Sequence, residues 1–396
     1  MTDTSRFRLA PTPGQEAALL GHCAHARYIW NLALEQWSMW SAGRRTSPPR
    51  FVEQARQLTE ARADSDWLRA GSQTVQQQAL RDFDQAVANF FTGPHRRPTW
   101  RKAGVHEGFR IVGPQARRVE KLNRRWARVL VPKVGWVKFR LSKPLTDAKS
   151  YRVARDRAGR WHVAFAVAPD PIAGPGTGAI VGIDRGVAVS AALSTGEKLH
   201  VPPQTTGERR RLDGLQRRLA RSQKCSNRRT RTKAAIAKLR AREVDRRKNW
   251  VEQTTTRIAR EFDVIRVEDL RIVQMTRSAK GTVDSPGKRV RQKAGLNRSI
   301  LANGWGQLVR RLERKAVGRV EKIPAAYTSQ TCSRCGTRDR KARESQAVFR
   351  CRSCGYTANA DVNAAVNIAA GRAVNARGAA EVPVAEKREP QLPTST

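Results

Sequence analysis

The chain has 396 residues, with 77 Lys and Arg against 34 Asp and Glu, so its formal net charge is +43. A charge of this size repels itself in a compact state, and general solubility charge rarely reaches it, so the composition predicts a protein neutralised by nucleic acid. The start of the chain does not resemble a signal peptide, and no apolar stretch approaches the roughly 18–20 residues that span a membrane. We therefore expect a cytoplasmic, nucleoid-associated protein of two or three domains that has no membrane partner.

The N-terminal region predicts a short strand followed by a helical lobe. Residues 5–10 read as the strand, and apolar side chains at three- and four-residue spacing predict a helix from Gly14 to about Met39. Two more helices are expected over 52–63 and 73–91. The aromatic stripe on these helices, which includes Phe83 and Phe90, favours a packed core over a platform for stacking bases.

Beyond the basic segment 93–104 the apolar pattern changes to a period of two. Val129 and Val131, and later Trp161, Val163 and Phe165, alternate with polar or small residues. This pattern is typical of antiparallel strands, and the Gly and Pro turns between them favour a barrel or curled sheet. The segment from Pro169 to Gly178, rich in Gly and Pro, is the clearest linker of the chain.

Two short apolar strands after the linker each end in a carboxylate. One strand precedes Asp184, in VGIDRG, and the other ends at Glu268, in DVIRVED. A turn residue before Gly186 is the alternative for Asp184, and a surface charge paired with arginine is the alternative for Glu268. Each alternative is at least as good as catalysis when either acid is considered alone.

Two basic helices lie between these strands, over 208–223 and from about Asn227 to Phe262. Nearly all charges on the second helix share one sign, which argues against a helix laced with salt bridges. We expect it to follow phosphates along a nucleic-acid duplex. The candidate contacts on it are Arg228, Arg229, Arg231 and Lys233.

After Glu268 the polar stretch 274–298 predicts a mobile loop that could cover a site, followed by a helix over 299–316 and a strand over 319–323. Four cysteines then form two C-x-x-C pairs separated by fifteen residues: Cys332, Cys335, Cys351 and Cys354. This spacing predicts a zinc ribbon with four thiolate ligands, in which glycines complete the two turns. Zinc thiolates together with the unpaired Cys23 and Cys225 fit a reducing compartment.

Asp361 follows the last cysteine pair and begins an Ala-rich helix. Taken alone it favours a helix N-cap, because Asp is among the residues preferred there. Together with Asp184 and Glu268, however, it supplies a third carboxylate at the edge of a regular element. Carboxylates that converge need cations between them, and a pair of magnesium or manganese ions about 4 Å apart would serve phosphodiester cleavage.

The order of these motifs resembles the split RuvC nuclease domain of TnpB, the transposon-encoded RNA-guided endonuclease, and of the related type V CRISPR effectors. The matching segments are GIDRG, VED, LNRSI followed by Trp305, YTSQTCSRCG, CRSCG and DVNAAVNI, together with RFRLAPTPGQEAALL and ARYIWNLAL near the N-terminus. Many relatives carry a charged residue just before the last aspartate, where this chain has Asn359 and Ala360. The three-acid assignment stands, although the detail of the third position differs.

The resemblance implies an α+β multidomain fold. A wedge β-barrel related to oligonucleotide-binding domains would comprise 1–13 and 105–170, with a helical recognition lobe, 14–104, inserted into it. An RNase H-like RuvC domain, a mixed sheet with helices, would comprise 178–326 and 360–372. The zinc ribbon, a target-nucleic-acid-binding insertion, would occupy 327–359, and a disordered tail 373–396.

The resemblance also implies a function: a metal-dependent endonuclease with a guide RNA from the transposon end, a double-stranded DNA target and a short target-adjacent motif. We expect a monomer with RNA, using Asp184, Glu268 and Asp361 with two magnesium or manganese ions. Gln77, on the helix over 73–91, is our candidate for reading an adenine of the motif, with surface filler as the alternative. Alternatives for the whole chain are a miniature type V CRISPR effector, a nuclease-dead guide-dependent repressor, and a structural zinc-ribbon protein of a ribonucleoprotein.

Overall fold

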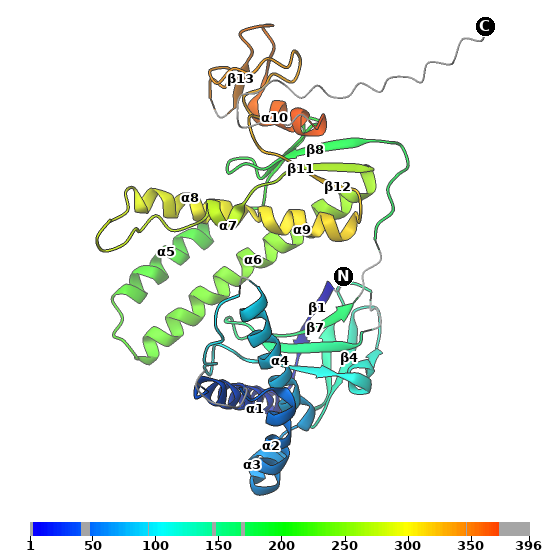
Figure 1. The fold of residues 1–396 in the computed structure, drawn as a ribbon, viewed down its shortest axis with the longest axis vertical. Helices are drawn as coiled ribbons and strands as arrows, with labels where there is room; N and C mark the ends of the chain where they lie inside the picture. The colour runs from blue at the N-terminus through cyan, green and yellow to red at the C-terminus, as the bar shows by residue number, and fades with distance from the viewer. Residues whose placement is uncertain are drawn as a thin grey trace, which may run out of the picture. The chain divides into compact units, whose positions relative to one another are not determined.

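The computed structural model describes residues 3–40, 48–93, 95–144, 148–167, 171–345 and 347–371. The chain divides into two compact units. Figure 1 shows the ribbon coloured by residue number from the N-terminus to the C-terminus. Unit 1 comprises Met1–Pro169 with Arg210–Leu239, and unit 2 comprises Asp170–Arg209 with Arg240–Thr396. The expected tail 373–396 lies outside the described residues, as do residues 41–47 and the first residues of the expected linker.

Unit 1 contains a seven-stranded antiparallel sheet with the order β2-β6-β7-β1-β5-β4-β3. Its N-terminal strand lies in the middle, paired with β7 and β5, so the helical lobe is an insertion between strands of one sheet. Alternate residues of each strand are buried, for example along β7, which confirms the period-two prediction. The strands are β1 Asp3–Ala10, β2 Gly108–Val112, β3 Val119–Lys121, β4 Trp126–Val131, β5 Gly135–Arg140, β6 Ser150–Arg155 and β7 Trp161–Val167, with a 3-10 turn η1 at Gly113–Arg117.

The helical lobe of unit 1 packs around α1 (Pro13–Ser38) and α4 (Gln73–Thr92), with α2 (Phe51–Asp64) and the short α3 (Asp66–Ala70) beside them. Thr12 caps α1 through a capping box with Gln15. Phe83 is 2% exposed and meets Trp30 edge to face, so this part of the aromatic stripe is core, as the sequence predicted, whereas Phe90 is half-buried against Trp37. Cys23 is also buried in this core.

Helices α5 (Thr206–Ala220) and α6 (Asn227–Glu261) follow one another as an antiparallel pair. In unit 1, Arg229 donates to the carbonyls of Leu219 and Ser222 and so braces the turn between them. In unit 2, Arg246 binds both carboxylate oxygens of Glu208. The first part of α6, from Asn227 to Arg242, carries no acidic residue.

Unit 2 contains a five-stranded mixed sheet with the order β10-β9-β8-β11-β12. The pairs β8–β9 and β9–β10 are antiparallel, whereas β8–β11 and β11–β12 are parallel. This is the RNase H-like arrangement that the resemblance implied. The strands are β8 Ile180–Asp184, β9 Ala191–Leu193, β10 Lys198–Leu199, β11 Val264–Glu268 and β12 Val320–Ile323; α10 (Ala360–Ala369) packs on this sheet.

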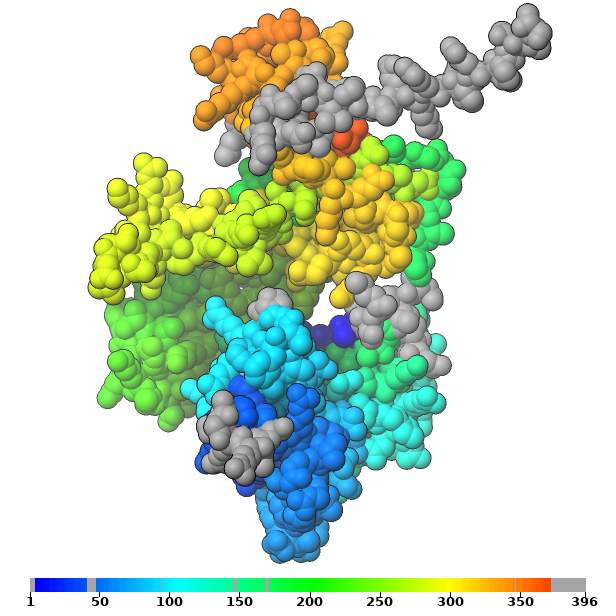
Figure 2. All heavy atoms as spheres, viewed as in Figure 1, coloured from blue at the N-terminus to red at the C-terminus, as the bar shows by residue number. Residues whose placement is uncertain are grey.

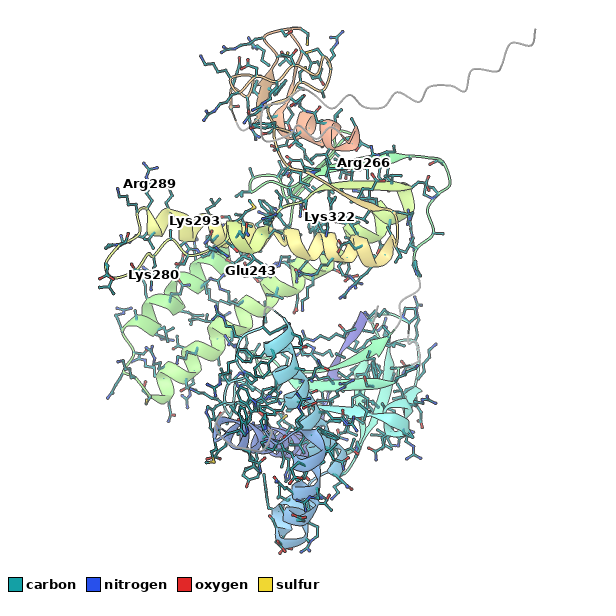
Figure 3. All side chains as sticks on the ribbon, viewed as in Figure 1. Glu243, Arg266, Lys280, Arg289, Lys293 and Lys322 are labelled. Atoms are coloured by element: carbon teal, nitrogen blue, oxygen red, sulfur yellow. The ribbon has the colours of Figure 1, made fainter. Side chains whose placement is uncertain are left out.

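The region after β11 differs from the sequence prediction. Residues from Val290 to Arg298, expected as part of a loop, are helical, and the single helix expected over 299–316 is divided into α8 (Val290–Asn303) and α9 (Trp305–Lys315). Gly304, with φ +68°, stands between them because a left-handed residue stops a helix. After the short α7 (Ile272–Met275), the remaining loop is anchored at its base by Lys293, which donates to the Met275 carbonyl and is labelled in Figure 3.

Across the described residues, no helix combines the length and apolar character that crossing a membrane requires.

Candidate active site and metal site

Two of the predicted acids end neighbouring parallel strands. Asp184 is the last residue of β8 and Glu268 the last residue of β11. The register pairs Ile183 with Val267, one residue before each acid. Because parallel strands present their carboxyl ends at the same edge, the fold brings these two carboxylates to one edge of the sheet.

The third acid, Asp361, lies in the first turn of α10 but is not its N-cap. Asn359 occupies that position, and its side-chain oxygen accepts a hydrogen bond from the Val362 amide at 3.3 Å. The N-cap interpretation of Asp361 is therefore wrong, which leaves its carboxylate available for other partners. Arg343 donates to it at 3.1 Å.

Helix α10 is held closely against the sheet. A side chain at Gly182, in β8, would collide with the backbone of Ala365 and Ala369 in α10, so the helix can lie this close only over glycine. Arg266 of β11, labelled in Figure 3, donates to the Ala369 carbonyl at 2.5 Å. These two contacts fix both the height of α10 above the sheet and its C-terminal end, and hence the place of Asp361.

The charges of Glu268 and Asp361 both act on Asp184. Burial, followed by the charges of Glu268 and Asp361, raises the pKa of Asp184 to about 7, while Arg343 acts in the opposite direction. Burial also raises the pKa of Glu268, and a 2.8 Å hydrogen bond from the Thr328 hydroxyl partly offsets this. Buried carboxylates that repel one another are poised to accept cations.

Two arginines near the acids were not predicted from the sequence. Arg343 contacts Asp361, and Arg185, which is 5% exposed, donates to the backbone carbonyl of Glu268. Nothing in the spacing of so many arginines distinguishes these two. Their positions near the acids depend on how the strands and the cysteine segment fold, which the sequence alone does not reveal.

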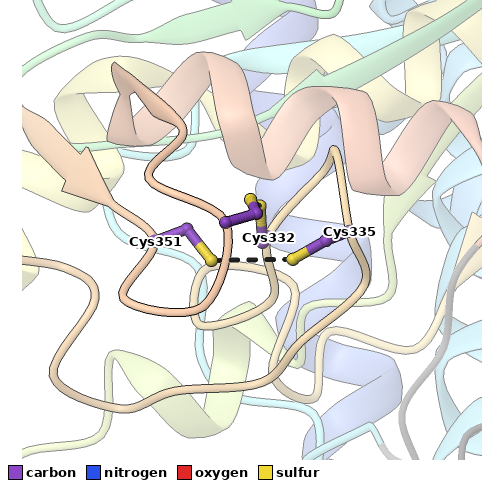
Figure 4. A group of neighbouring side chains, drawn as sticks. Cys332, Cys335 and Cys351 are labelled. Atoms are coloured by element: carbon purple, nitrogen blue, oxygen red, sulfur yellow. Dashed lines mark hydrogen bonds between the residues drawn. The ribbon is translucent and has the colours of Figure 1, made fainter.

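The four predicted cysteines come together. Their sulfur atoms all lie within 4.8 Å of one another, and in the described part of the chain they are the one group of three or more His, Cys, Asp or Glu residues gathered so closely. The sulfurs of Cys335 and Cys351, joined by a dashed line in Figure 4, are 3.6 Å apart, and the Cys332 and Cys354 sulfurs are 3.8 Å apart. Zinc–sulfur bonds of about 2.3 Å give a tetrahedral edge of about 3.8 Å, so the cluster fits a zinc-sized ion.

The cysteine pairs sit in two equivalent turns. The Gly336 amide donates to the Cys332 carbonyl, and the Gly355 amide donates to the Cys351 carbonyl. Both glycines have positive φ, +78° and +69°, as the sequence predicted for the turns. A hairpin of β13 (Val348–Arg350) and β14 (Thr357–Asn359) completes this segment. We call residues 327–359 the cysteine ribbon; it is coloured orange in Figure 2.

Two asparagines join the cysteine ribbon to α10. Asn363 donates to the Thr331 carbonyl and accepts from the Ser333 amide, and Asn367 donates to the carbonyls of Thr328 and Thr331. Both asparagines are buried. Their four-residue spacing in an otherwise apolar helix is a signal that the sequence analysis could have used.

The predicted nucleic-acid contacts differ in their surroundings. Gln77 is half-buried, whereas Gln76 and Gln78 are buried, so Gln77 is the most accessible of the three. Arg228, Arg231 and Lys233 are exposed on α6, but Arg229 is engaged with the carbonyls of the preceding turn. All five remain predictions, and Arg229 has a structural role besides.

Three models of related protein families match successive parts of the chain. A helix-turn-helix domain model of the IS605 OrfB type matches residues 1–45, a probable-transposase model of the same type matches 145–279, and a Cas12f1-like TNB domain model matches 305–368. The last match includes the cysteine ribbon and Asp361.

Two curated relatives match over nearly their whole length. A protein named RNA-guided DNA endonuclease InsQ, from Escherichia coli (strain K12), is 35% identical over an alignment of 382 residues that covers 94% of this chain and 93% of the relative. A protein named RNA-guided DNA endonuclease, from Streptomyces pristinaespiralis, is 30% identical over an alignment of 419 residues that covers 98% of this chain and 96% of the relative. Among solved structures, a Cas12f1–sgRNA–target DNA complex aligns with a TM-score of 0.54 at 12% identity, covering 93% of this chain and 98% of that one, which shows a shared fold.

Proposed function

The chain belongs to the TnpB (IS605 OrfB) family of RNA-guided DNA endonucleases, and from this premise we propose that it cuts double-stranded DNA by metal-dependent phosphodiester hydrolysis. A guide RNA from the transposon end would select the target by base pairing, while the protein reads a short flanking motif. Cleavage would serve to retain or spread the element.

The observation that carries this proposal is the shared environment of Asp184, Glu268 and Asp361. Their carboxylate oxygens suit magnesium or manganese, which when bound would activate water and stabilise the leaving oxygen. Thr328 holds Glu268 by its hydroxyl, and Arg343 neutralises Asp361.

We further propose that the cysteine ribbon holds one structural zinc ion. Four thiolates leave no open coordination position, so the ion would shape the ribbon and take no part in hydrolysis. The ribbon in turn holds α10 through Asn363 and Asn367, so it positions Asp361.

The same family assignment supports roles for the rest of the chain. We propose that the sheet of residues 1–13 and 105–170 is a wedge domain and that 14–104 is a recognition lobe. Residues 178–326 and 360–372 form the nuclease domain, which receives the ribbon 327–359 as an insertion. Unit 1 groups Arg210–Leu239, the α5–α6 turn region, with the wedge and lobe instead of the nuclease domain.

Variants of the three acids test the nuclease. Asp184→Ala, Glu268→Gln and Asp361→Ala should each abolish magnesium-dependent cleavage of a guide-matched DNA, because each removes a ligand oxygen. Binding of guide RNA and target should persist, since phosphate contacts dominate affinity. Asp284→Asn, an exposed acid in the loop before α8, is the matched control and should cleave normally. Cleavage near the wild-type rate by one acid variant would remove that residue from the site, and a wild-type protein that binds without cutting would identify a guide-dependent repressor.

A further inference from the structure

Two arginines on the sheet of unit 1 share one carboxylate. Arg110 of β2 and Arg152 of β6 are direct cross-strand partners on the face opposite the core. Asp82 of α4 pairs with the Arg152 guanidinium and lies 3.9 Å from Arg110 Nη1. Like charges directly opposite on neighbouring strands destabilise a sheet, and one carboxylate offsets only one of them.

A third arginine belongs to the same cluster. The backbone of Arg101 is held by reciprocal hydrogen bonds with the Asn31 side chain, at 2.8 and 3.1 Å. Its guanidinium carbon lies 3.6 Å from the centre of the Trp30 ring. Burial lowers the pKa of Arg101 to about 10, and Asp82 raises it while Arg152 lowers it, so all three groups act on one another.

The cluster therefore holds three guanidiniums and one carboxylate, a surplus of two positive charges. The surplus remains open to solvent, because the side chains of Arg110 and Arg152 are 42% and 45% exposed. Arg128 on the same sheet provides the contrast, since Glu120 pairs with it one to one at 2.6 Å. An unbalanced, prepositioned group of guanidiniums is suited to a phosphate, whose oxygens they bind in pairs.

We propose that Arg101, Arg110 and Arg152 form a binding site for a backbone phosphate of nucleic acid, with Asp82 holding the guanidiniums until the phosphate arrives. Trp100, beside Arg101, is 50% exposed, and single strands are commonly bound by such combinations of aromatic rings and cations. The inference rests on the proposed function only for its partners, guide RNA and target DNA. It predicts binding, whether or not the protein cleaves.

The test measures binding of guide RNA to the free protein, and of target duplex to the RNA-loaded protein, over a series of salt concentrations. Arg110→Gln and Arg152→Gln should each weaken one of the two bindings by about tenfold, because a charged hydrogen bond is lost. The slope of log affinity against log salt should fall by about 0.9 for duplex DNA or about 0.7 for a single strand. If guide-RNA binding weakens, the site holds the guide RNA; if binding of the target duplex weakens, the site holds the target DNA.

Asp82→Asn separates this site from an ordinary ion-pair cluster. Removing the competing carboxylate should leave nucleic-acid binding as tight as in the wild type or tighter, whereas a purely structural cluster would make it behave like the arginine variants. Arg128→Gln is the control and should change affinity less than about twofold, because Glu120 already offsets its charge. Unchanged affinity and salt slope in both arginine variants would overturn the proposal. So would an Asp82→Asn protein that unfolds earlier and binds as weakly as the arginine variants.

Discussion

Replacing Asp184 with Asn should stabilise the protein when divalent cations are absent. Its folded-state pKa is raised to about 7 from an ordinary value of 3.8, because the carboxyl is buried beside Glu268 and Asp361. A raised folded pKa gives stability that is full below the unfolded value and is lost as the pH climbs to about 7. At about 1.36 kcal/mol per pH unit, this window gives an upper bound of about 4 kcal/mol. Asparagine keeps the shape without the charge, so we expect a gain of about 2–4 kcal/mol at pH about 8.

Thermal unfolding measures this gain. The buffer is stripped of free divalent ions over a chelating resin, which should not remove a zinc ion held by four thiolates. At about pH 8 the midpoint of Asp184→Asn should exceed the wild type by roughly 5–10 °C, and the difference should shrink toward about pH 5. Millimolar magnesium should raise the wild-type midpoint more than that of the variant, because a ligand stabilises the state that binds it.

Asp284→Asn, which changes an exposed acid, should melt like the wild type at both pH values. If Asp184→Asn melts earlier at about pH 8, or if its effect is independent of pH, the carboxylates do not repel one another and the shared-site reasoning is wrong.

Three further predictions concern the groups around the site and the lobe. Cys351→Ser should lose zinc by elemental analysis and lower both the unfolding midpoint and cleavage, since structural zinc contributes directly to folding; a fully active, zinc-free variant would contradict this. Thr328→Val removes the hydroxyl that favours ionised Glu268, a bond of about 1.5–3 kcal/mol, so half-maximal cleavage should need more magnesium, and an unchanged magnesium titration would count against it. Gln77→Ala should relax one position of the flanking motif in a randomised-flank cleavage assay, at roughly 1–3 kcal/mol, whereas an unchanged motif and rate would return Gln77 to the role of surface filler.

The parts that sequence predicted well are those carried by local pattern. Alternation along β7, the apolar spacing of α4 and each C-x-x-C turn depend on neighbours within a few residues, so the burial of Phe83 and the two cysteine turns could be predicted from spacing. The helix break at Gly304 was not predicted, because a glycine inside an apolar pattern can either be tolerated in a helix or end it. In this chain its left-handed conformation ends the helix.

The surroundings of the acids could not be predicted because they depend on contacts between distant segments. Thr328 reaches Glu268 from 60 residues away, and Arg185 reaches the Glu268 carbonyl from 83 residues away. Their partners are set by the register of β8 and β11 and by the path of the cysteine ribbon. The N-cap alternative for Asp361, which the residue favoured when taken alone, is wrong because Asn359, two residues earlier, occupies the cap position.

The central position of β1 in its sheet has a consequence for synthesis of the protein on the ribosome. Residues Asp3–Arg8 pair with His162–Val167, so the strand made first waits for one of the last strands of the unit. At 5–20 residues per second this delay is roughly 8–30 s, during which Phe7 lacks its partner strand β7. A fusion or deletion at β1 should therefore disturb the middle of the sheet. Its first effect should be a lower yield of soluble protein and not a change in cleavage by the three acids.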